Sequence, residues 1–114
     1  MKDFKISILG AEWSVFFRNK VEDKMLETCD GYTDWTNKTI VVISQSDNEI
    51  DCVKNFEELK KKTARHEIIH AFLFESGIGS NLEHKDFGHE ETMVDWLAFQ
   101  FPKMQKIFAE CGLL

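Results

Sequence analysis

Residues 63–74 read Thr-Ala-Arg-His-Glu-Ile-Ile-His-Ala-Phe-Leu-Phe, and the predicted fold is built around this run. It belongs to a longer stretch without glycine or proline, which predicts a helix from about Phe56 to Ser76. Asn55 is suited to cap the start of that helix, and Gly77 supplies its end. Apolar residues within the run can anchor one side of the helix in a core while its histidines line a cleft.

Two histidines four residues apart, His66 and His70, share one face of this helix, one turn above the other. They can therefore direct two imidazoles at one metal ion. Glu67 lies about 100° around the helix, where its carboxylate can hold a metal-bound water without being a ligand. Zinc hydrolases need two neutral nitrogen ligands beside a general base, and zinc lowers the pKa of its water to about 7. The alternative is that the two histidines have this spacing by chance.

A catalytic zinc site needs a third protein ligand and a fourth position that is open to water. The metzincin pattern requires a histidine at 76 and a glycine at 73, but these residues are Ser76 and Leu73, which excludes that class. The other common solution is a carboxylate from a second helix. Glu91 follows His70 by 21 residues, and Asp95 lies one turn further along the same face. This resembles the gluzincin arrangement and predicts Glu91 as the ligand, with Asp95 hydrogen-bonded to a ligand histidine. The reverse assignment stays open.

Three further side chains are candidates for a part in the chemistry. His84 and His89 lie in a predicted loop between the helices. Either could replace the third ligand or stabilise an oxyanion, although loop histidines are more often simply solvated. Tyr32 is the only tyrosine, so a mechanism with a phenol donor would require it, but nothing near it in the sequence supports that role.

The remaining pattern predicts an α+β fold in one domain, residues 1–114, with a small mixed or antiparallel sheet packed on the active-site helix. Alternating or β-branched residues predict strands at Phe4–Leu9, Trp13–Phe17 and Thr39–Ser44. Turn-forming residues are concentrated between Asp30 and Asn37.

A second helix is predicted from about Glu90. Apolar residues occupy most of its circumference, so we expect it to be buried, with Met93, Trp96 and the phenylalanines in the core. Pro102 should break or kink this helix because proline lacks the N–H and clashes with the preceding turn. Lys103–Glu110 should then form a last helical segment.

The composition is that of a folded domain, with 114 residues of which 43% are apolar and 30% charged. The net charge of −6 repels phosphate backbones, and we expect the one basic run, Lys60–Lys62, on a solvated helix face. Nucleic acid is therefore not an expected partner. Cys29, Cys52 and Cys111 form no CxxC pair, which favours free thiols in a reducing compartment. No signal peptide or membrane-spanning run is recognisable, so we expect a cytoplasmic protein with no membrane partner.

Two segments together resemble a known family. Residues 65–73, Arg-His-Glu-Ile-Ile-His-Ala-Phe-Leu, and residues 89–98, His-Glu-Glu-Thr-Met-Val-Asp-Trp-Leu-Ala, look like small metallopeptidases encoded by phages and prophages. Those proteins are similar to the ImmA/IrrE-like zincins. The resemblance implies a minimal zincin fold in which His66, His70 and a downstream acid bind Zn²⁺ and Glu67 is the catalytic base. Larger relatives usually carry a Glu-Ala-Asn element near the third ligand, where this chain has Met-Val-Asp.

The leading hypothesis is a zinc-dependent metallopeptidase. Glu67 would take a proton from the water and pass it to the leaving amine of a peptide or protein substrate. The resemblance suggests an intracellular regulatory protein as substrate, in the cytoplasm of a phage-bearing host. The strand Thr39–Ser44 could be the sheet edge on which an extended substrate pairs. The alternative is a non-enzymatic phage-encoded binding or regulatory protein whose zinc site is structural or vestigial.

Overall fold

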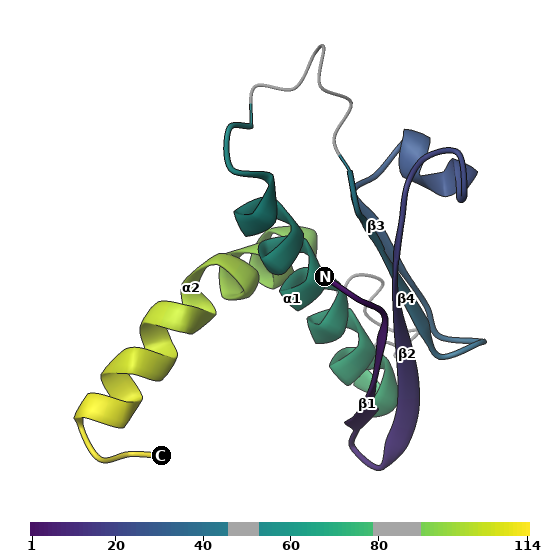
Figure 1. Ribbon diagram of the computed structural model, residues 1–114. Coiled ribbons are helices and arrows are strands. Elements are labelled where there is room, and N and C mark those ends of the chain that lie inside the picture. Colours follow the sequence, from purple (N-terminus) through teal and green to yellow (C-terminus); the bar gives the residue numbers. More distant parts are fainter. Residues whose placement is uncertain (46–52, 79–89) are drawn as a thin grey trace.

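The computed structural model describes residues 1–45, 53–78 and 90–114. Within these ranges a mixed sheet packs against the first of two helices, and the second helix lies against the first (Figure 1). The α+β class predicted from the sequence is confirmed. In chain order the elements are β1 (Phe4–Ile8), β2 (Ala11–Arg18), the 3₁₀ helix η1 (Lys24–Glu27), β3 (Gly31–Asp34), β4 (Thr39–Ile43), α1 (Phe56–Glu75) and α2 (Glu91–Glu110).

The sheet has the strand order β1-β2-β4-β3. β1 and β2 form an antiparallel hairpin, β2 and β4 pair in parallel, and β3 returns antiparallel beside β4. The hairpin turns at Leu9 and Gly10, which have φ angles of 50° and 88°. Glycine adopts this left-handed conformation without steric cost, so Gly10 suits the tight connection.

β4 lies inside the sheet, between β2 and β3. The expectation that Thr39–Ser44 offers a free edge to a substrate is therefore wrong. The β-branched sequence of this strand fits a position that is paired on both sides and covered on both faces. The edge strand beside β4 is β3, whose residues Gly31–Asp34 the sequence pattern assigns to a turn region.

Side chains of β4 alternate between the two faces of the sheet. Ile40 and Val42 belong to the core cluster under α1, whereas Val41 and Ile43 pack with Leu26 of η1 on the opposite face. The other buried members of the cluster under α1 are Ile8, Trp13, Val15, Phe17, Ala64 and Ala71. The packing of this core thus fixes the position and orientation of α1 on the sheet.

α1 begins at its predicted cap. The Asn55 side chain accepts a hydrogen bond from the Glu58 backbone N–H at 3.3 Å. The helix ends at Glu75, and Gly77 follows with a φ of 84°, as a helix C-terminus favours. The Trp13 indole donates a hydrogen bond to Glu75 Oε1 at 2.8 Å, which ties this end of the helix to β2.

α2 is not buried as the sequence pattern predicts. Within it only Val94 and Ala98 are buried, and Met93, Trp96 and Phe99 are each more than half exposed. Figure 1 shows the yellow C-terminal half of α2 extending beyond α1. The apolar circumference is covered on one side only, because in the described part of the chain α2 has α1 as its main packing partner.

The sequence predicts a break or a kink at Pro102. Pro102 lies inside α2 and does not end it, so the break is wrong, and Lys103–Glu110 continues the same helix. Proline removes the N–H that would bond the carbonyl of Ala98, four residues earlier. The Arg65 side chain of α1 replaces that donor: its Nε lies 2.7 Å from the Ala98 oxygen. An inter-helix hydrogen bond therefore satisfies the carbonyl that proline leaves open.

Two other expectations concern the whole chain. Cys29 and Cys111 are free thiols, and Cys52 lies outside the described residues. In the described ranges, no helix has the length and apolarity needed to cross a membrane.

Candidate metal centre

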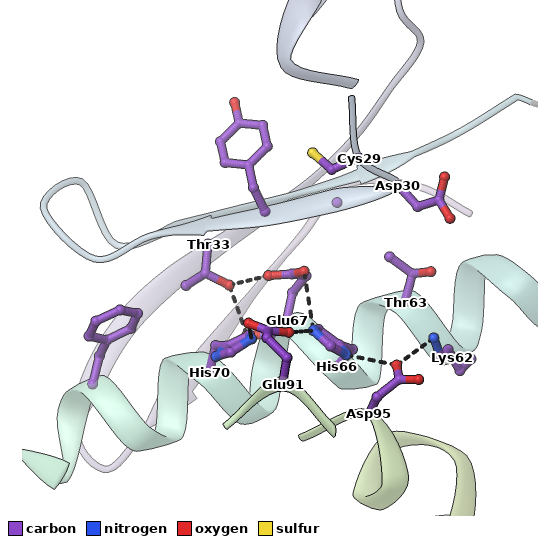
Figure 2. Close-up of a pocket in the computed structure, with 13 residues that line it drawn as sticks. Cys29, Asp30, Thr33, Lys62, Thr63, His66, Glu67, His70, Glu91 and Asp95 are labelled. Atoms are coloured by element: carbon purple, nitrogen blue, oxygen red, sulfur yellow. Dashed lines mark hydrogen bonds and ion pairs between the residues drawn. The ribbon is translucent and has the colours of Figure 1, made fainter. Parts of the chain in front are cut away.

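Side chains from both helices converge at the point where α2 begins beside the middle of α1 (Figure 2). One ligand atom from each of His66, His70 and Glu91 lies within 4.8 Å of the other two. Nε2 of His66 is 3.0 Å from Glu91 Oε2, and Nε2 of His70 is 3.0 Å from Glu91 Oε1. The two imidazole rings are 4.9 Å apart between centroids. The spacing of the histidines on α1 produces this convergence, as the sequence predicts.

Asp95 lies one turn along α2 from Glu91 and contacts the other nitrogen of the same histidine. Its Oδ1 is 3.0 Å from Nδ1 of His66. Burial opposes the ionisation of Asp95, but hydrogen bonds from Lys62 and His66 outweigh it and hold the pKa of this carboxyl below its ordinary value. Asp95 is therefore an anion that accepts the Nδ1–H of His66 and directs Nε2 toward the cluster.

The His70 ring is buried, with 8% of the residue exposed. Burial lowers the pKa of His70, and the charge of His66 acts in the same direction, while Glu91 opposes them. At neutral pH the ring is therefore neutral, the form in which histidine binds a metal.

Glu67 lies next to His66 on α1, and its side chain faces β3, beside the cluster formed by His66, His70 and Glu91. Its Oε2 lies 2.6 Å from the Thr33 hydroxyl, and its Oε1 is 3.9 Å from Nε2 of His66. The residue is 7% exposed, and burial raises the pKa of its carboxyl although the Thr33 hydrogen bond opposes the shift. A carboxylate that is held out of water in this way is a stronger base than an exposed one.

Gly31 lets β3 come close to α1 beside Glu67. A Cβ on this residue would lie 2.9 Å from Cγ2 of Thr63, 2.9 Å from the carbonyl oxygen of Val41 and 3.3 Å from Cγ of Glu67. One of these neighbours is backbone, so the space cannot be recovered by a rotamer change. The close approach brings Thr33 within reach of the Glu67 carboxylate.

The cluster opens into a cleft of about 610 Å³ between β3 and the two helices. Gly31 and Thr33 line one wall, and the histidines, Glu67 and Glu91 line the other. Tyr32 also lines the cleft, but its hydroxyl donates a hydrogen bond to Asp23 on the η1 side. The hydroxyl is thus already engaged, which leaves the phenol-donor role without structural support.

The residues fit a zinc ion by the chemistry of their donors. In its neutral form an imidazole has one N–H; with that N–H of His66 donated from Nδ1 to Asp95, the lone pair of Nε2 would face the Glu91 carboxylate. A cation between these two groups would satisfy both. Two histidines and one glutamate are a known ligand set of catalytic zinc, and ligand atoms around tetrahedral zinc are separated by about 3.3–3.5 Å. The two His–Glu separations of 3.0 Å are close to this range, and the three ligand atoms as a set lie within 4.8 Å of one another, so the side chains would have to draw together around the ion.

The structure thus brings together all five residues selected from the sequence: His66, Glu67, His70, Glu91 and Asp95. His84 and His89 lie outside the described residues.

Four contributors were not predicted: Gly31, Thr33, Lys62 and Arg65. The expectation of a solvated face for Lys60–Lys62 is wrong for Lys60, which is 6% exposed, and for Lys62, which pairs with Asp95. A lysine and an arginine at 62 and 65, next to the histidine motif, are the only sequence signal that could have suggested two of them. The contacts of Gly31 and Thr33 depend on strand order and leave no local pattern.

Comparison of the chain with models of known protein families, with curated proteins and with solved structures gave no match.

Proposed function

We propose that this chain binds one zinc ion through His66, His70 and Glu91 and hydrolyses peptide bonds with Glu67 as general base. The observation that carries the proposal is the convergence of the three ligand atoms within 4.8 Å, with a buried carboxylate 3.9 Å from the first histidine. The zincin resemblance of the sequence is consistent with the same activity.

The side chains of the site have distinct tasks in this proposal. A bound zinc ion would supply Lewis acidity and make water acidic enough to ionise near neutral pH. Glu67 accepts the proton of the attacking water and returns it to the leaving nitrogen, and its raised pKa suits both transfers. Thr33 holds the Glu67 carboxylate in one orientation through the 2.6 Å hydrogen bond. Asp95 fixes the tautomer of His66.

An extended peptide is the substrate that suits the cleft. β3 is one of the two edge strands of the described sheet, and its residues line one wall of the cleft. An edge strand has unpaired N–H and C=O groups, so a peptide can pair with it by main-chain hydrogen bonds. A peptide bound in this way would run along β3, within reach of the histidines and Glu67.

The test is a Glu67→Gln variant assayed on a library of unstructured peptides. We expect cleavage to fall by about 10²–10⁴-fold, because general-base catalysis contributes about that much, while zinc content is unchanged. Glu58→Gln, the same substitution at an exposed position of α1, is the matched control and should cleave normally. Cleavage by Glu67→Gln at the wild-type rate would exclude this mechanism.

A second candidate is a non-enzymatic regulatory protein with a structural zinc. It is favoured by the weak attachment of α2, in which only Val94 and Ala98 are buried. Zinc bound between His66, His70 and Glu91 would tie α2 to α1 and contribute directly to folding. In that case zinc would raise the melting temperature strongly, and the zinc-loaded protein would cleave no peptide of the library.

A further inference from the structure

Lys62 holds the carboxylate of Asp95 from the turn of α1 that precedes His66. Nζ of Lys62 lies 2.6 Å from Oδ1 of Asp95, and the same oxygen lies 3.0 Å from Nδ1 of His66 (Figure 2). Lys62 and His66 are four residues apart, so their side chains share one face of the helix. One carboxylate oxygen therefore connects an ammonium group to the ring of a proposed metal ligand.

The surroundings of Lys62 distinguish it from the surface lysine beside it. Its side chain is 19% exposed, and its ammonium group lies 4.6 Å from the ring centroid of Phe99, one turn beyond Asp95 on α2. The side chain of Lys61 is 53% exposed and lies 3.8 Å from Glu58. An exposed ion pair such as Lys61–Glu58 contributes little to stability. The carboxylate and the aromatic ring of α2 together hold the Lys62 ammonium group in one place.

This position of Lys62 determines which role Asp95 can take. Asp95 and Glu91 lie one turn apart on α2, and both carboxylates contact His66, at Nδ1 and Nε2 respectively. The amino-acid sequence alone allows either acid to be the third ligand. The Lys62 ammonium group attracts Asp95 toward the first half of α1 and thereby opposes its rotation toward the cluster.

We propose that Lys62 is a positioning residue of the metal centre, which keeps Asp95 on Nδ1 of His66 and outside the ligand set, so that Glu91 completes the site. The inference rests on the proposed zinc site. In this proposal Lys62, which lies outside the histidine motif, determines which of the two neighbouring acids, Glu91 or Asp95, binds the metal.

The experiment measures zinc affinity by competition with a chromophoric chelator. For Lys62→Met we expect the zinc dissociation constant to rise about tenfold, the lower end of the range for residues that act through a ligand. Lys62→Arg keeps a cation that pairs with carboxylates, and should stay within about threefold of wild type. Lys61→Met, the matched control at the exposed neighbour, should bind zinc as wild type does.

Two further measurements separate positioning from a general effect on stability. In an Asp95→Asn background, Lys62→Met should cause no additional loss of affinity, because the group that it positions is absent. In cobalt-substituted Lys62→Met, the visible spectrum should lose intensity as Asp95 enters the ligand set and raises the coordination number. A merely structural lysine would lower the melting temperature in both backgrounds and leave the cobalt spectrum unchanged.

Equal zinc affinity of Lys62→Met and Lys61→Met would overturn the proposal, and so would an equal loss with and without Asp95. If Lys62→Met does not fold, the zinc-loaded wild-type crystal structure decides: Asp95 on His66 and Lys62 supports the proposal, and Asp95 on the metal refutes it. Absence of zinc binding in the wild type itself would refute the proposed site, which is a separate result.

Discussion

Replacing Arg65 by methionine removes the donor that satisfies the Ala98 carbonyl inside α2. The bond from Arg65 Nε is 2.7 Å long, and Ala98 is 0% exposed, so its carbonyl is shielded from water in the folded chain. Pro102 supplies no N–H to that carbonyl. A buried acceptor left without a partner costs about 1–3 kcal/mol, and we expect Arg65→Met to lower the free energy of unfolding by about 2 kcal/mol.

The same Arg65→Met substitution is then made in a Pro102→Ala variant, because alanine restores the N–H that lies one helical turn from Ala98. In that background Arg65→Met should cost about 0.5 kcal/mol, which leaves a coupling of about 1.5 kcal/mol between the two positions. Any change in helix propensity from Pro102→Ala is common to both members of the pair and cancels in the cycle.

The assay is urea unfolding followed by circular dichroism, with a chelator present so that bound metal contributes nothing to stability. Lys61→Met, an exposed substitution on the same helix, should change the free energy of unfolding by no more than about 0.5 kcal/mol. An equal cost of Arg65→Met in the two backgrounds would show that the Arg65–Ala98 bond does not compensate for the proline.

Two other predictions concern the wall of the cleft. Gly31→Ala should destabilise the fold by about 1–3 kcal/mol, the usual cost of overpacking, because the added Cβ would lie 2.9 Å from both Thr63 and a backbone oxygen. A melting temperature equal to that of the wild type would contradict the close approach of β3 to α1. The pKa of Tyr32, the only tyrosine, is raised to about 12 by burial and by its hydrogen bond to Asp23, so its absorbance at 295 nm should titrate near pH 12 in the folded protein and near pH 10 in urea. Because the folded pKa is the higher one, this stabilisation is complete below about pH 10 and is lost as the pH rises toward 12, a decline that Tyr32→Phe should remove.

The features that the sequence predicts well are those that depend on neighbours along the chain. The Asn55 cap, the length of α1 and the face shared by His66 and His70 follow from helical periodicity alone. The hairpin of β1 and β2 and the β-branched strand β4 follow from short-range alternation. The placement of Glu91 and Asp95 one turn apart is equally local, although which nitrogen each carboxylate contacts is not.

What the sequence does not predict depends on partners far away in the chain. β4 is paired on both sides because β2 lies parallel to it, an arrangement with no local signature. The exposure of Trp96 reflects the absence of a second packing layer on α2 in the described part of the chain. Pro102 is tolerated because Arg65, 37 positions earlier in the chain, donates a hydrogen bond to the Ala98 carbonyl. The polar contacts that complete the site, from Thr33 and Lys62, likewise arise from tertiary packing.

The most direct test of the proposed metal centre is the zinc content of the purified, zinc-loaded chain, measured by elemental analysis together with the zinc affinity of two variants. We expect one zinc ion per wild-type chain and a loss of affinity of at least about 100-fold in Glu91→Gln, which removes a ligand. A smaller loss, of about 10–100-fold, is expected in Asp95→Asn, which removes only the hydrogen bond to His66. A wild-type chain without zinc, or a Glu91→Gln variant that binds zinc as tightly as wild type, would contradict the proposed metal centre.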